Sequence, residues 1–182
     1  MKRGLKATAI GVAIAIAFTA IIPTHVGASS RTTAATPSRG PRAGSTLGVL
    51  SLPTINVRKP LVVGIDDMAL ARGLGLWPGT PIPGDSGNAV IAGHRTSHGA
   101  PMLNIDRLKV GDPIFFTTTG RAATTYEFRI TKRKIVTPDA MWITRPTSGT
   151  TLTLFACHPP HSISFRYVIF AKLVSKPQRT TA

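Results

Sequence analysis

Residues 151–160 read TLTLFACHPP. Polar and apolar side chains alternate along the first half of this stretch, which predicts a half-buried β-strand that ends on Cys157. The two prolines that follow cannot continue a central strand, because each lacks an N–H donor and has a fixed φ. A second apolar run, residues 163–174, begins just after them and carries Arg166, nine positions beyond the cysteine. We expect the turn to fold the second strand back beside the first, which would bring Arg166 within side-chain reach of Cys157. The sequence leaves the pairing register of the two strands open.

The rest of the chain repeats this pattern of short apolar runs between Gly, Pro, Asp and Asn residues. The runs are rich in Val, Ile, Leu, Phe and Thr, and they cover residues 47–57, 60–64, 88–92, 113–119, 124–136, 150–156 and 163–174. Seven or eight strands at this spacing are typical of a mainly β protein with a closed or nearly closed β-barrel.

The segments between the predicted strands show little helical character. Helical signal is limited to one or two short turns, near residues 66–72 and 102–108. The proline-rich residues 78–85 predict a rigid surface loop, of the kind that often frames a binding site. Residues 141–143, MWI, precede the cysteine strand and either line a pocket or cover the end of the barrel.

A second predicted strand end also presents a reactive side chain. Residues 88–95 read NAVIAGHR, a short apolar strand that stops at Gly93 and delivers His94 to a loop. The thiolate is the nucleophilic form of cysteine, and nearby cations favour it, so Cys157 beside a His and an Arg is a candidate nucleophile. Two simpler interpretations stay open: Cys157 as a small buried hydrophobic side chain, and His94 as a structural hydrogen-bonding residue.

Composition narrows the class of protein. The chain has 182 residues, enough for one domain and a tail, and its 42% hydrophobic content is too high for wholesale disorder. One cysteine excludes an intramolecular disulfide framework and a cysteine-rich zinc finger. Residues 1–50 hold six of the 22 bases and no acid, which leaves 16 bases against 7 acids, a net +9, on residues 51–182. This charge favours anionic partners, but the bases are scattered without interleaved aromatic side chains, so we expect no nucleic-acid binding.

The N-terminus has the layout of an export signal. Three bases in the first six residues precede an apolar run, residues 7–22, that is a little short of a membrane-spanning helix. Small residues up to Ala28 leave a cleaved signal peptide and an uncleaved anchor both open. The basic flank predicts a cytoplasmic N-terminus and a domain on the extracellular face of the membrane. We expect a signal or anchor over 1–28, a flexible linker over 29–46, a folded domain over 47–176 and a tail over 177–182.

Taken together, these segments resemble the sortase family, the cysteine transpeptidases that attach proteins to Gram-positive cell walls. The resemblance rests on TLTLFAC followed after eight residues by Arg166, on AGHR at residues 92–95, and on WPGTP at residues 77–81 together with Gly84. It covers about residues 47–174, and the Gly-His-Arg and Cys-His-Pro spellings are most similar to class E sortases of actinobacteria. One departure is Ala156, where the family usually has threonine before the cysteine.

The resemblance implies a fold, a reaction and three residue roles. The fold would be the family's closed eight-stranded β-barrel. Cys157 would attack the carbonyl after Thr in an LPXTG or LAXTG sorting signal and form a thioacyl enzyme. His94 would act as acid and then as base, and Arg166 would hold the substrate and stabilise the oxyanion. The partners would be surface proteins with a sorting signal and an acceptor amine from a peptidoglycan precursor or a pilin, and no cofactor or metal is implied.

Three alternatives compete with this interpretation. Residues 97–100, SHGA, resemble an L,D-transpeptidase segment, but that enzyme needs a cysteine nucleophile where this chain has alanine. A secreted basic β-barrel that binds anionic wall polymers without catalysis also fits the composition, and it predicts that Cys157→Ala is silent. The third is a metal site, although no carboxylate lies close in sequence to orient the imidazoles. Its candidate ligands are His94, His98, Cys157, His158 and His161.

Overall fold

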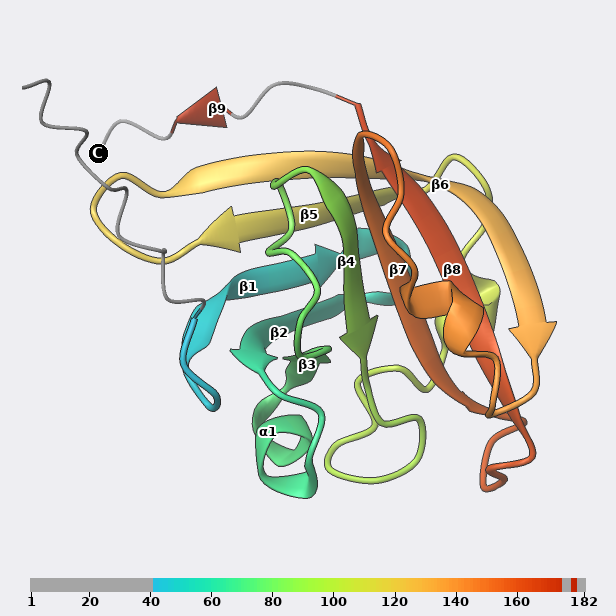
Figure 1. Cartoon of the computed structure of the whole chain (residues 1–182). Coiled ribbons are helices and arrows are strands. Elements are labelled where there is room, and N and C mark those ends of the chain that lie inside the picture. Colours follow the sequence, from blue (N-terminus) through green and yellow to red (C-terminus); the bar gives the residue numbers. More distant parts are fainter. Residues whose placement is uncertain (1–40, 175–177, 180–182) are drawn as a thin grey trace, which may run out of the picture. The chain divides into compact units, whose positions relative to one another are not determined.

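The computed structural model of the protein describes residues 41–174 and 178–179 (Figure 1). Its strands are β1 (Thr46–Leu52), β2 (Val57–Val63), β3 (Leu74–Leu76), β4 (Gly87–Ala92), β5 (Pro113–Thr118), β6 (Thr124–Val136), β7 (Thr150–His158), β8 (Phe165–Leu173) and the two-residue β9 (Gln178–Arg179). Its helical elements are α1 (Asp67–Arg72) and three 3-10 turns, η1 (Pro53–Ile55), η2 (Ile105–Arg107) and η3 (Met141–Thr144). The two helical turns expected from the sequence correspond to α1 and η2.

Eight of the strands form a closed barrel. Neighbours follow the order β5-β1-β2-β3-β4-β7-β8-β6, and β6 also pairs with β5, which closes the ring. Closure pairs the strand edges that an open sheet would leave free. The short β9 pairs with the beginning of β6. The predicted mainly β fold, an eight-stranded barrel with one or two short helices, is confirmed.

One barrel strand, β3, lies outside the predicted runs. Its sequence, LGL, is too short to show alternation, yet it joins β2 to β4 and all three of its residues are buried. Gly75 is needed at its centre because a Cβ there would collide with the carbonyl oxygen of Gly64. The predicted run 47–57 also differs from the structure, since Pro53 begins η1 and divides the run into β1 and β2.

Apolar side chains fill the barrel, and β7 shows how they determine its orientation. Leu152, Leu154 and Ala156 of this strand belong to the buried core. Because side chains alternate between the two faces of a strand, the odd-numbered residues of β7, Cys157 among them, face outward. A one-residue slip would expose both leucines, and burying one such side chain is worth about 1.5–3 kcal/mol.

β4 and β7 run side by side in parallel, so their C-terminal ends meet at one end of the barrel (Figure 1). Their pairing extends from Gly87 opposite Thr150 to Ala92 opposite Phe155. One more backbone hydrogen bond follows, from the N–H of Gly93 to the carbonyl oxygen of Phe155, at 3.2 Å. His94 and Cys157 come directly after this point, from parts of the chain more than sixty residues apart.

Gly93→Ala is expected to destabilise the strand end that carries His94. A Cβ at this position would lie 2.6 Å from Cγ of Met102 and 2.7 Å from Cδ2 of Leu74, both in the packed core. Overpacking of this kind costs about 1–3 kcal/mol, which urea unfolding of the variant would measure. The double variant Gly93→Ala/Met102→Ala is expected to lose less than the sum of the two single changes. Strict additivity would contradict the predicted clash.

The predicted signal or anchor (1–28) and parts of the predicted linker (29–46) and tail (177–182) lie outside the described residues. In the part that the structure describes, no helix has the length and apolar character needed to cross a membrane. The last residues before β1 are bonded to the barrel, since the N–H of Gly44 donates to the carbonyl oxygen of Val63 at 2.7 Å. Arg72 in turn donates to the carbonyl oxygen of Gly44 at 2.6 Å.

Candidate active site

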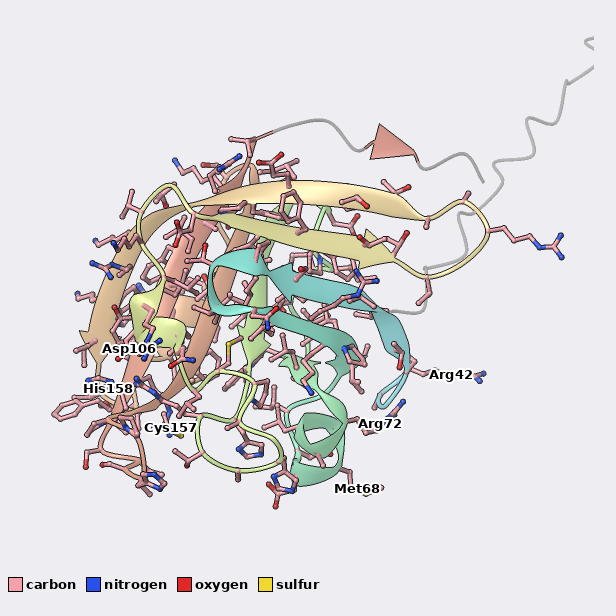
Figure 2. All side chains as sticks on the ribbon, turned by 180° about the vertical axis from the view of Figure 1, so that it is seen from behind. Arg42, Met68, Arg72, Asp106, Cys157 and His158 are labelled. Carbon is pink, nitrogen blue, oxygen red and sulfur yellow. The ribbon has the colours of Figure 1, made fainter. Side chains whose placement is uncertain are left out.

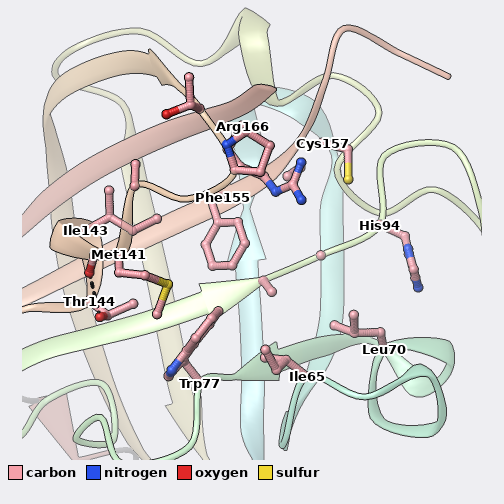
Figure 3. Close-up of a pocket in the computed structure, with 16 residues that line it drawn as sticks. Ile65, Leu70, Trp77, His94, Met141, Ile143, Thr144, Phe155, Cys157 and Arg166 are labelled. Atoms are coloured by element: carbon pink, nitrogen blue, oxygen red, sulfur yellow. Dashed lines mark hydrogen bonds between the residues drawn. The ribbon is translucent and has the colours of Figure 1, made fainter. Parts of the chain in front are cut away.

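Cys157 and Arg166 are direct cross-strand partners. The antiparallel pairing of β7 with β8 places Cys157 opposite Arg166 and Ala156 opposite Tyr167. Opposite Cβ atoms in such a pair are about 4.5–5.5 Å apart, so the two side chains stand next to each other on the outer face. Cys157 is a free thiol, half-buried, and Figure 3 shows the guanidinium of Arg166 and the sulfur of Cys157 at the same end of a pocket. The register of β7 and β8, which the sequence left open, therefore places these two predicted site residues next to each other.

The Arg166 guanidinium is anchored but not neutralised. Its Nη1 donates to the carbonyl oxygens of Ile163 and Phe165, at 2.9 and 3.0 Å. Neither of the two ion pairs found among the described residues includes Arg166. Because a guanidinium has five N–H donors, this anchoring leaves a positive charge and further donors for an anionic group beside Cys157.

His94 reaches the same pocket from the end of β4. Its carbonyl oxygen accepts a hydrogen bond from the N–H of Met102 at 2.9 Å, which holds the start of the following loop. The imidazole stacks on His98, with ring centroids 4.8 Å apart. Nε2 of His94 is buried without a hydrogen-bond partner in the described part of the chain. An unsatisfied buried nitrogen is costly, so its retention here is consistent with a group that serves a substrate.

Burial and charge both act on the His94 imidazole. Burial lowers the pKa of His94, because desolvation disfavours the charged ring, and the charge of His98 lowers it further. The carboxylate of Asp67, at the start of α1, opposes these effects by raising the pKa. The net pKa of His94 lies below the ordinary histidine value, so the neutral imidazole predominates at pH 7.

Two single substitutions are expected to move the pKa of His94 in opposite directions. His98→Asn removes a positive neighbour and raises it, whereas Asp67→Asn removes a negative neighbour and lowers it. The pH titration of the His94 ring proton by NMR, assigned by its loss in His94→Ala, measures both shifts. Shifts of the same sign in the two variants would contradict this account of the site's electrostatics.

An apolar cavity of about 320 Å³ leads to Cys157. One wall comes from Ile65, Leu70 and Trp77, and the opposite wall comes from Met141 and Ile143 of η3 (Figure 3). Cys157, Arg166 and His94 line the same cavity. A cavity lined mainly by apolar and aromatic side chains, with a few polar groups, is typical of a ligand-binding site.

Residues 141–143 divide between the two roles that the sequence left open. Met141 and Ile143 line the cavity, and Ile143 is buried. Trp142 turns away, stacks on Phe170 at 6.0 Å between ring centroids, and lies under the ammonium of Lys134 at 5.0 Å. One 3-10 turn therefore both lines the pocket and covers the outside of the barrel.

A second cavity, of about 430 Å³, also borders Cys157. His94 and Cys157 line both cavities. The second one is more polar, since Thr96, Ser97, His161 and Ser162 also line it. Cys157 and His94 thus border both an apolar cavity and a more polar one.

The remaining candidates from the sequence are placed differently. No set of three His, Cys, Asp or Glu side chains within the described residues is placed to hold a metal ion. His158 faces away from the thiol, and its Nδ1 lies 2.6 Å from Nη1 of Arg95. The AGHR pattern includes Arg95, which is 2% exposed, but the sequence assigned it no role of its own. Its position could have indicated a role, because this charged residue directly follows a buried strand and a candidate catalytic histidine.

An eight-stranded barrel that presents Cys, His and Arg side chains where two neighbouring strands end is the layout expected of a cysteine-dependent acyl-transfer protein. Comparison with known families agrees with this class. The sortase domain model matches residues 50–174, and the chain belongs to the sortase family.

Known relatives show which members of the sortase family the chain resembles. Sortase D of Bacillus subtilis is 31% identical over 140 residues, which cover 74% of this chain and 67% of that protein. Sortase SrtE1 of Streptomyces coelicolor is 27% identical over 154 residues, which cover 75% of this chain but 43% of that protein. The solved structure of sortase E from Streptomyces avermitilis superposes with a TM-score of 0.68 at 27% identity, over 76% of this chain and 93% of that one. The predicted sortase resemblance, including its likeness to class E, is confirmed.

Proposed function

We propose that the chain is a sortase transpeptidase that cleaves an LPXTG-type or LAXTG-type sorting signal after its threonine. The observation that carries the proposal is the placement of Cys157 directly opposite Arg166, with His94 on the same cavity. Membership of the sortase family supports the same reaction class.

The first half of the reaction forms a thioacyl enzyme. His94 takes the proton of the Cys157 thiol, and the sulfur forms a bond to the threonine carbonyl carbon. Arg166 donates to the resulting oxyanion through N–H groups that do not hold Ile163 and Phe165. The carbon–nitrogen bond then breaks, His94 gives its proton to the leaving glycine amine, and the acyl group stays on the sulfur.

The second half transfers the acyl group to an amine. The acceptor nitrogen attacks the thioester carbon, His94 removes a proton from it, and the carbon–sulfur bond breaks to release Cys157. The lowered pKa of His94 suits this step, because the neutral ring is the form that accepts a proton. We assign the sorting signal to the apolar cavity and the acceptor amine to the polar cavity, since each matches the chemistry of its lining.

The proposed setting is the outer surface of the membrane. The basic and apolar N-terminal sequence supports an anchor with a cytoplasmic N-terminus and an extracellular domain. Partners in that setting are surface proteins that carry the sorting signal, and a peptidoglycan precursor or pilin that supplies the amine.

Mass spectrometry of peptide reactions tests the proposal. The full chain in detergent is mixed with LAXTG and LPXTG peptides, with hydroxylamine as the acceptor. We expect cleavage after threonine, a threonine hydroxamate product, and an acyl adduct on Cys157 when hydroxylamine is omitted. Absence of adduct and product with both peptides, from a chain whose folding is verified by thermal melting, would refute the proposed specificity.

The non-catalytic alternative makes a different prediction. A basic barrel that only binds anionic wall polymers would bind them equally well as Cys157→Ala and would form no hydroxamate. Peptide turnover by the unmodified chain that disappears in Cys157→Ala would exclude that alternative.

A further inference from the structure

In the part of the chain that the structure describes, no backbone hydrogen bond joins the ends of β4 and β7 at His94 and Cys157. The β4–β7 pairing ends at Ala92 opposite Phe155, and the N–H of Gly93 makes the last backbone hydrogen bond. Among the described residues, no backbone hydrogen bond joins His94 or Arg95 to Cys157 or His158. The separation of His94 and Cys157 therefore depends on contacts beyond the ladder.

A side-chain hydrogen bond lies where the ladder stops. Arg95 follows His94, His158 follows Cys157, and Nη1 of Arg95 lies 2.6 Å from Nδ1 of His158. Because successive side chains in an extended strand point to opposite faces, His158 lies behind the outward-facing Cys157. Arginine can only donate, so Nδ1 of His158 accepts and the proton of its neutral ring is on Nε2.

Arg95 is itself held in place. Its side chain is 1% exposed, its Nη2 pairs with Asp106 at 2.9 Å, and its Nε donates to the carbonyl oxygen of Leu103 at 3.2 Å. Figure 2 shows Asp106, His158 and Cys157 at one end of the barrel. The loop after His94, the turn η2 and the end of β7 thus meet on one buried guanidinium, whose planar fork of donors allows several partners at once.

We propose that Arg95 and His158 are positioning residues, whose hydrogen bond sets the separation of the His94 imidazole and the Cys157 thiol. The inference rests on the proposed function, because it assigns this pair a role in proton transfer between those two groups. A displacement of about 1 Å between reacting groups can cost about 100-fold in rate, so the bond has a measurable consequence.

Two matched variants of His158 separate a positioning role from a packing role. In His158→Asn, the side-chain oxygen takes the place of Nδ1 and still accepts from Arg95, whereas His158→Leu has similar bulk and no acceptor. With the better of the two sorting-signal peptides, we expect His158→Leu to lose about 10- to 100-fold in kcat with KM within about threefold. We expect His158→Asn to stay within about threefold of the unmodified chain.

A second readout needs no peptide. The rate of Cys157 alkylation by iodoacetamide is measured against pH in the unmodified full chain, in His94→Ala and in both His158 variants. The profile of the unmodified chain is expected to differ from that of His94→Ala because the neutral imidazole can accept the thiol proton as the sulfur is alkylated. His158→Leu is expected to follow His94→Ala, and His158→Asn is expected to follow the unmodified chain.

The outcomes distinguish this proposal from the proposed function. An unmodified profile in His158→Leu, an equal loss in His158→Asn and His158→Leu, or no effect of His94→Ala on alkylation would each overturn the positioning role. Failure of peptide turnover in the unmodified chain, with the expected alkylation profiles, would refute the proposed substrate and leave the positioning role supported. Arg95→Met should reproduce His158→Leu; if it does not fold, the His158 pair still decides.

Discussion

Cys157→Ala is expected to reduce turnover of a sorting-signal peptide by about 10⁴-fold or more, with a thermal melting temperature close to that of the unmodified chain. The thiol supplies the bond that holds the acyl group between the two half-reactions, and no neighbouring group can replace it. Stability should change little, because the side chain is half-buried on the outer face and loses only its sulfur. Hydroxamate formation and calorimetry measure the two quantities.

Cys157→Ser provides the matched control for this prediction. The hydroxyl preserves the shape of the side chain, but it is a far weaker acid and a weaker nucleophile than a thiol, so the His94 imidazole activates it much less readily. We expect it to be nearly as inactive as Cys157→Ala while still binding the peptide. Turnover within tenfold of the unmodified chain in either variant would exclude Cys157 as the nucleophile.

Arg166→Met is expected to lower kcat/KM by about 10²- to 10³-fold. Removing one donor to a developing oxyanion typically costs this much, and Arg166 is the cation directly opposite Cys157. Arg166→Lys is expected to recover only part of the loss. An ammonium keeps the charge, but a point charge cannot hold both Ile163 and Phe165 and also reach the substrate oxygen as the guanidinium fork does. Steady-state kinetics of both variants measure these effects.

Arg129→Met is the control for nonspecific loss of positive charge. Arg129 lies on β6, opposite Pro113 and Lys172, and lines neither cavity beside Cys157. We expect its kcat/KM to stay within about threefold of the unmodified chain, since an exposed charge distant from the site has little effect on the reaction. A similar loss in Arg129→Met and Arg166→Met would mean that net charge, and not a placed donor, assists the reaction.

The sequence by itself determined the class of fold and singled out three candidate catalytic side chains. Alternating apolar runs between Gly and Pro residues are a local signal, so the strands β4 to β8 and the short helix α1 follow from it closely. Cys157, His94 and Arg166 stood out because their side-chain chemistry is a property of the residue and their positions at strand ends follow from the same local pattern.

Only the tertiary structure decided how these residues meet. Alternation repeats every two residues, so a shift of the strand pairing by two residues would keep the same face inside and is not excluded by the pattern. The pairing of Cys157 with Arg166 therefore depends on core packing and on the turn between the strands. The strand β3 has only three residues and exists because its neighbours in the ring bury it.

Arg95 gives the clearest physical reason for this division. Sequence patterns place a charged residue on the surface, because burying an unpaired guanidinium is costly. Here the cost is offset by Leu103, Asp106 and His158, which lie in segments up to 63 residues away and come together only in the folded barrel. Local patterns therefore determined which residues are candidates for the reaction, and long-range contacts determined what holds them in place.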